Sequence, residues 1–110
     1  MKSILRLQEQ YARIEQQLSH AGYISQGSVF QRRPGQQGSR YVWTRKVKAK
    51  TVTVALSQEQ YRWLRQAVAN QRKLEKNIRQ MQKLSRQILF ASFPDVTRRN
   101  PLDKSVLGLI

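Results

Sequence analysis

The middle of this chain contains a long stretch that lacks acidic residues altogether. Between Glu15 and Glu59 there is no Asp or Glu, and basic side chains are interleaved there with aromatic and β-branched ones. The basic residues are Arg32, Arg33, Arg40, Arg45, Lys46, Lys48 and Lys50, and the apolar ones include Phe30, Tyr41, Val42, Trp43, Val47, Val52 and Val54. Because aromatic and β-branched residues favour strands, the stretch is expected to fold as a basic sheet, a surface that suits a polyanion such as nucleic acid.

Three short strands are expected in this stretch. The first covers about residues 27–33, and a turn rich in Pro and Gly follows it. The second covers about residues 40–47, and a short basic turn leads into the third, residues 51–56. In the third strand Val52, Val54 and Leu56 alternate with Thr51, Thr53 and Ala55. This alternation predicts one face on a core and one in water, as in an antiparallel meander covered by a helix.

Two helices are expected to flank the sheet. In residues 3–20 the apolar residues recur every three or four positions, as in the seam of a coiled coil. They are Ile4, Leu7, Tyr11, Ile14 and Leu18. After the sheet, Ser57 and Gln60 form a capping-box pattern, and a long helix with a near-heptad apolar stripe is expected from about Gln58 to about Ala91. A helix of this length spans about 50 Å, more than a three-stranded sheet covers, so its remainder should pair with the first helix, a second copy or another protein.

The predicted fold class is therefore α+β, with an N-terminal helix, a three-stranded antiparallel sheet and a long C-terminal helix of coiled-coil character. Residues 1–91 are expected to form a single helix–sheet–helix domain. Residues 92–110 contain Pro and scattered charges and end in an apolar run. They are expected to be a flexible tail or a segment that docks on a partner, and the flexible interpretation is favoured.

Composition favours a binding protein over an enzyme. Lys and Arg number 21 against 6 acidic residues, which gives a formal net charge of +15. The chain has no Cys and one His, His20, and its acidic residues are scattered. Such a set predicts no catalytic triad, metal site or cofactor, and the Gly-containing turn lacks the Lys and Ser/Thr of a phosphate-binding loop. We expect no enzymatic activity.

Charge also indicates the partner and the location. Phosphate backbones neutralise such a charge, and binding should then depend steeply on salt; an anionic membrane surface is the rival partner. The N-terminal residues do not resemble a signal peptide, and no stretch reaches the ~20 apolar residues of a membrane span. A cytoplasmic, nucleoid-associated protein is therefore expected, with DNA as the partner and RNA as the second option.

The second strand has two faces that differ in chemistry. Tyr41 and Trp43 share one face with Arg45, which we expect to be buried, whereas Arg40, Thr44 and Lys46 share with Val42 a face that we expect to be wet. A narrow β-ribbon with such a face fits the major groove of DNA. Alternatively, Trp43 and Tyr41 are an exposed platform on which single-stranded bases stack. In the first strand the choice between Val29, Gln31 and Arg33 and the set Ser28, Phe30 and Arg32 stays open.

The candidate contacts to nucleic acid lie on two elements. The basic face of the long helix is either a second phosphate-binding surface or the solvated exterior of a coiled coil. The sheet and its turns contribute Arg32, Arg33, Arg40, Thr44, Arg45, Lys46, Lys48, Lys50, Thr51 and Thr53, and the long helix contributes Arg72, Lys76, Arg79 and Lys83.

Several short runs resemble a known family. They are Gly27-Ser-Val29, Tyr41-Val-Trp-Thr-Arg-Lys-Val47, Lys50-Thr-Val-Thr-Val54, Leu56-Ser-Gln-Glu-Gln60, Ala69-Asn70 and Arg72-Lys-Leu-Glu75. Over about residues 22–90 the chain resembles a family of small bacterial proteins of unknown function that are often encoded beside insertion-sequence transposases. Many members carry a Cys-rich insertion between the first two strands, where this chain has only Pro34 to Ser39. The resemblance implies a mobile-element context and no catalytic residues.

A looser likeness is to the three-stranded sheet plus helix with which tyrosine recombinases bind DNA arm sites, an analogy of fold alone. Taken together, we expect a non-catalytic nucleic-acid-binding protein whose target is double-stranded DNA and which is accessory to a transposase or similar element. The alternative is an assembly protein, whose heptad helices form a homodimer or clasp an acidic protein partner.

Overall fold

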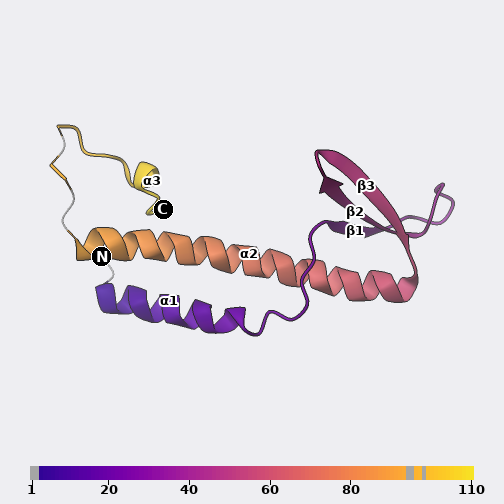
Figure 1. Ribbon diagram of the computed structural model, residues 1–110, viewed down its shortest axis with the longest axis horizontal. Coiled ribbons are helices and arrows are strands. Elements are labelled where there is room, and N and C mark those ends of the chain that lie inside the picture. The colour runs from indigo at the N-terminus through magenta and orange to yellow at the C-terminus, as the bar shows by residue number, and fades with distance from the viewer. Residues whose placement is uncertain (1–2, 94–95, 98) are drawn as a thin grey trace. The chain divides into compact units, whose positions relative to one another are not determined.

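The computed structural model describes residues 3–93, 96–97 and 99–110, and it confirms the α+β fold class. The elements are α1 (Ile4–Leu18), β1 (Ser28–Gln31), β2 (Tyr41–Val47), β3 (Lys50–Leu56), α2 (Gln58–Ser92) and α3 (Lys104–Leu107) (Figure 1). The predicted boundaries of α1, the strands and α2 agree with these to within two residues. None of the described helices is long and apolar enough to span a membrane.

The chain divides into two compact units, and the division falls within α2. One, here called the helical unit, comprises Met1–His20 and Glu75–Ile110, and the other, the sheet unit, comprises Ala21–Leu74. Each unit is described by itself. That residues 1–91 form a single domain stays a prediction.

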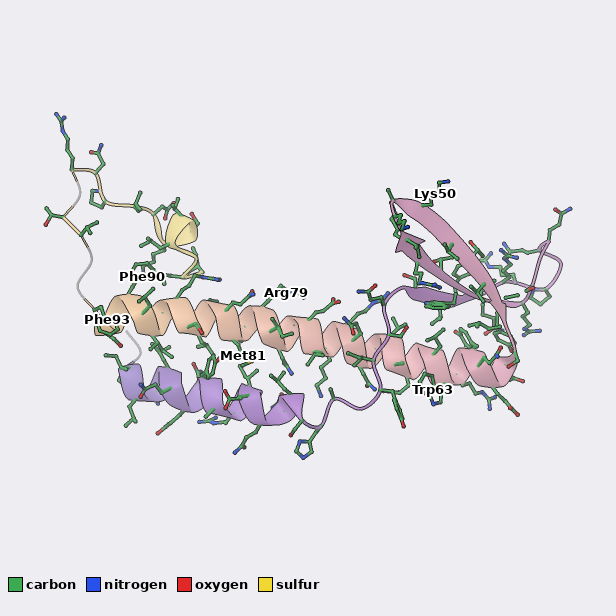
Figure 2. All side chains as sticks on the ribbon, viewed as in Figure 1. Lys50, Trp63, Arg79, Met81, Phe90 and Phe93 are labelled. Carbon is green, nitrogen blue, oxygen red and sulfur yellow. The ribbon has the colours of Figure 1, made fainter. Side chains whose placement is uncertain are left out.

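The helical unit is built on the predicted heptad seam. Ser3 caps α1, because its side-chain oxygen accepts a hydrogen bond from the Arg6 backbone N–H at 3.2 Å. Leu7 is buried on α1 and Leu84 on α2, with exposed fractions of 4% and 1%. Figure 1 shows α1 alongside the C-terminal half of α2, and Figure 2 shows Met81 pointing from α2 toward α1. The narrow apolar seam of α1 thus packs on α2 of the same chain.

A third helix, which the sequence pattern did not indicate, lies in the C-terminal segment. Arg86 of α2 donates from Nε to the Gly108 carbonyl oxygen at 2.7 Å, and Gln87 donates from Nε2 to that of Leu109 at 2.9 Å. Gly108 ends α3 in the left-handed conformation, with a φ of 73°. These contacts attach the end of the chain to α2. Of the predicted tail, residues 94, 95 and 98 lie outside the described residues.

The sheet unit contains the predicted antiparallel meander, with strand order β1-β2-β3. Its register defines two faces. The aromatic face consists of Val29, Gln31, Tyr41, Trp43, Arg45, Val52, Val54 and Leu56. The polar face consists of Ser28, Phe30, Val42, Thr44, Lys46, Thr51, Thr53 and Ala55. The register therefore settles the open choice in β1: Val29 belongs with the aromatic residues and Phe30 with the polar face.

The start of α2 is fixed by the predicted capping box. The Gln60 backbone N–H donates to the Ser57 hydroxyl at 3.1 Å, and the Ser57 backbone N–H donates to the Gln60 side-chain oxygen at 2.8 Å. One turn later the ring of Tyr61 lies against that of Tyr41, with centroids 4.9 Å apart. This contact joins the aromatic face to α2.

The prediction of one buried and one wet face is only partly right. Tyr41 and Trp43 are half-buried, and Lys46 is exposed, as expected. Val42, however, is 1% exposed although it belongs to the face expected to be wet. It sits in the middle strand, between cross-strand neighbours Phe30 and Ala55. The polar face is thus apolar around Val42 and hydrophilic toward the β2–β3 turn.

Candidate nucleic-acid interface

Four of the predicted site residues form two cross-strand pairs on the polar face. Thr44 lies opposite Thr53, and Lys46 lies opposite Thr51. All except the half-buried Thr44 are exposed. Cross-strand partners on one face have their Cβ atoms about 5 Å apart. The strands therefore present a compact patch of hydroxyl groups and one ammonium group.

The β2–β3 turn adds charge at the end of the hairpin, where the register puts Lys46 on the polar face and Lys50 on the side of the aromatic face. Val47 pairs with Lys50, so the turn contains only Lys48 and Ala49. Both have positive φ, 50° and 65°, as a two-residue hairpin turn of type I′ requires. Lys48 and Lys50 are exposed, and Figure 2 shows Lys50 at the far end of the hairpin. With Lys46, they form what we call the lysine tip, three ammonium groups within five residues.

Backbone strain at this turn gives a testable prediction. Asn and Gly are the residues best suited to the left-handed conformation, whereas other side chains collide with the backbone there. Ala49→Gly should therefore raise the free energy of unfolding by about 0.5–1 kcal/mol, measured by urea denaturation, and should leave binding to duplex DNA unchanged. Lys48→Asn should also stabilise the hairpin but should weaken that binding. Destabilisation by both substitutions would contradict the turn geometry.

Two of the predicted arginines are directed at aromatic rings. The Arg45 guanidinium lies 4.4 Å from the centroid of Trp43, whose indole N–H donates to the Gln26 carbonyl oxygen at 3.0 Å. Arg40 lies 5.8 Å from the Tyr41 centroid, and with the Gln31 amide turned to present its oxygen, Arg40 donates to it at 2.9 and 3.1 Å. Both guanidinium groups thus contact residues of the aromatic face. Arg40 was predicted to share the wet face with Thr44 and Lys46; its guanidinium instead contacts the aromatic face.

Arg32 organises the loop between β1 and β2. Its Nη1 donates to the Gln37 carbonyl oxygen at 3.1 Å, and its guanidinium lies 5.9 Å from the Phe30 centroid. Gly38 has a φ of 93°, and a Cβ there would collide with the Arg32 side chain. Arg33 is exposed, and its backbone N–H donates to the Gln36 side-chain oxygen at 2.7 Å. Arg32 thus has a structural role, whereas the Arg33 side chain is accessible to solvent.

The predicted cations of α2 divide between the two units. Arg72 belongs to the sheet unit and donates to the Ser28 hydroxyl at 3.4 Å. Lys76, Arg79 and Lys83 belong to the helical unit, where Lys76 and Arg79 are exposed and Lys83 is half-buried. Figure 2 shows Arg79 on the side of α2 away from α1. The sheet candidates and these three helix candidates therefore belong to different units.

Sequence reasoning missed an exposed aromatic pair in the sheet unit. Tyr23 and Trp63 have exposed fractions of 75% and 56%, and their ring centroids are 5.2 Å apart. The signal was present in the sequence, because Trp63 falls outside the apolar stripe of the long helix. A large aromatic residue off the buried stripe is one that the helix leaves exposed.

Comparisons with known proteins add no further assignment. No protein-family model, curated protein or solved structure matches the chain. Within residues 3–93, 96–97 and 99–110, no three His, Cys, Asp or Glu side chains lie together in a way that would hold a metal ion.

Proposed function

We propose that this protein binds nucleic acid without catalysing a reaction, and that its target is double-stranded DNA. The observation that carries the proposal is a hairpin with exposed hydroxyl groups on its polar face and the exposed lysine tip at its end. It combines hydroxyl groups, which can bond base edges or phosphates, with ammonium groups that bind phosphates. A two-stranded β-ribbon is narrow enough to enter the major groove.

The charge of the sheet unit supports a polyanionic partner. Glu59 is the only acidic residue between residues 21 and 74. The basic residues in the same range are Arg32, Arg33, Arg40, Arg45, Lys46, Lys48, Lys50, Arg62, Arg65, Arg72 and Lys73. Such an excess produces a positive potential that attracts DNA, and binding releases counterions from the phosphates.

In this mechanism the β2–β3 turn and the strand β3 have different roles. Lys48 and Lys50, at the turn, contact phosphates and set the orientation of the hairpin. Thr51 and Thr53 face the groove, where a threonine methyl can contact a thymine methyl and a hydroxyl can bond a base edge. The phosphate contacts supply affinity for DNA of any sequence, and the threonines supply the preference for particular base sequences.

A salt series tests the proposal directly. Binding of the full chain to a duplex, a single strand and an RNA should be measured by fluorescence anisotropy between ~0.05 and ~0.3 M salt. We expect duplex affinity to fall linearly on a log–log plot, with a slope of about −0.9 for each phosphate neutralised. Negligible affinity for all three nucleic acids at ~0.1 M salt would refute nucleic-acid binding.

The mobile-element context is part of the proposal and rests on the family resemblance. A nucleoid-associated DNA-binding protein of this kind would hold or mark a DNA site for a transposase, the protein that carries out the chemistry.

A second candidate function, assembly through the helical unit, is favoured by its exposed apolar side chains. Leu5, Ile78, Leu89 and Phe93 are all exposed, Leu5 at 66%. Ile78, Leu89 and Phe93 follow one another at spacings of 11 and 4 residues, which places them along one side of α2 and its C-terminal end, and an exposed apolar stripe of this kind marks a protein interface. Sedimentation equilibrium with the wild type and Leu5→Gln would distinguish a homodimer, which the substitution should weaken, from a monomer.

A further inference from the structure

The aromatic pair Tyr23–Trp63 lies on a side of α2 that the proposed duplex-binding patch does not use. Figure 2 shows Trp63 projecting from α2 away from the β-sheet, and all of these elements belong to the sheet unit. Both rings are mostly exposed, and their planes are tilted by 40°. Ile24, also exposed, adjoins Tyr23 in the chain. The sheet unit thus leaves two large ring surfaces in water.

Hydrogen bonds fix the segment that carries Tyr23. The Asn70 side chain donates to the Tyr23 carbonyl oxygen at 2.9 Å, and Gln66 in turn donates to the Asn70 side-chain oxygen at 2.9 Å. The Ser25 backbone N–H donates to the Ala67 carbonyl oxygen at 3.2 Å. The backbone on both sides of Ile24 is therefore attached to α2. A ligand of the two rings would meet a surface that is already ordered, which reduces the entropy lost on binding.

The chemistry of this surface specifies its ligand. Exposed aromatic rings favour a planar, weakly hydrated partner, and the basic excess of the sheet unit favours an anionic one. Unpaired nucleotides combine both properties, whereas a duplex keeps its base faces stacked inside. Aromatic side chains on a positively charged domain are the usual platform for single strands. Arg62, next to Trp63, is exposed and available to a phosphate.

We propose that Tyr23 and Trp63 form a stacking site for unpaired bases of a single-stranded nucleic acid. This proposal rests on the proposed nucleic-acid binding, but it assigns a separate surface and a separate form of the ligand. The acidic residue nearest in sequence, Glu59, precedes Trp63 by one helical turn. Since its carboxylate repels phosphate, Glu59→Gln should strengthen single-strand binding by about twofold.

Tryptophan fluorescence tests the proposal, because the chain has only two Trp residues. In a Trp43→Phe background the emission reports Trp63 alone, and circular dichroism checks that this background is folded. Titration with oligo(dT), oligo(U) and a blunt duplex should show quenching by the single strands and little by the duplex. The DNA and RNA arms show whether the sugar matters. Tyr23→Ala should lower single-strand affinity by about tenfold, and Tyr23→Phe should retain it.

Two control variants make the result specific. Ile24→Ala removes an exposed apolar side chain without removing a ring, so it should change single-strand affinity less than twofold. The lysine-tip variant Lys50→Ala should weaken duplex binding but not the quenching of Trp63. Duplex binding without quenching by either single strand would overturn the stacking site and leave the proposed function standing. Equal losses for Ile24→Ala and Tyr23→Ala would also overturn it and would indicate an apolar protein contact. Absence of all binding would refute both proposals.

Discussion

Replacing Leu84 by Ala is expected to destabilise the helical unit by about 3 kcal/mol. Leu84 is 1% exposed, the lowest value among the buried side chains of α2. Its truncation removes buried methyl groups and leaves a cavity that the surrounding side chains cannot fully close. Because stabilities of small domains are only about 5–15 kcal/mol, the loss should appear as a marked fall in the midpoint of thermal denaturation, followed by circular dichroism.

Ile78→Ala is the matched control, since Ile78 lies on the same helix but is 42% exposed. It removes a similar apolar side chain from a similar backbone and should cost well under 1 kcal/mol, within the usual range for surface positions. Equal effects of the two substitutions would mean that Leu84 is not part of a packed core in solution.

Removing the three ammonium groups of the lysine tip is expected to weaken duplex DNA binding by about a hundredfold at ~0.1 M salt. The triple variant is Lys46→Ala, Lys48→Ala and Lys50→Ala. Each lysine that contacts a phosphate also contributes about one unit to the salt slope. The slope of log affinity against log salt should therefore become shallower by about three units. Fluorescence anisotropy at several salt concentrations measures both quantities.

A variant with the same net charge separates a site from a general charge effect. Arg6→Ala, Arg13→Ala and Lys104→Ala also remove three positive charges, from exposed positions of the helical unit. We expect this variant to bind the duplex within a few-fold of the wild type. Comparable losses for the two triple variants would mean that the lysine tip has no special role. The double variant Arg79→Ala and Lys83→Ala then measures what the basic side of α2 adds.

The fold could be predicted because its determinants are local. The alternation of Val52, Val54 and Leu56 with the smaller or polar Thr51, Thr53 and Ala55 predicts a strand from adjacent residues alone. The capping pattern of Ser57 and Gln60 marks a helix start from four residues. Heptad spacing in residues 3–20 identified the side of α1 that is buried.

The parts that escaped prediction depend on contacts distant in sequence or on side-chain freedom. Val42 is buried through its place in the middle strand, although its neighbours in sequence suggested a wet face. Arg40 and Arg45 have long, flexible side chains, and strand alternation does not determine that their guanidinium groups contact aromatic rings. The Tyr23 segment is fixed by a hydrogen bond from Asn70, 47 positions away. No local sequence pattern predicts a hydrogen bond between residues so far apart in the chain.

A backbone hydrogen bond closes the base of the loop between β1 and β2, and this determines where the chain can accept insertions. The last backbone contact between the two strands is the bond from the Arg32 N–H to the Arg40 carbonyl oxygen, 2.7 Å long. The strand register is thus complete before the chain enters residues 33–39. Lengthening a surface loop costs little, about 0.6 kcal/mol for each doubling of its length. This position can therefore accept an inserted segment while the sheet and its polar face stay unchanged.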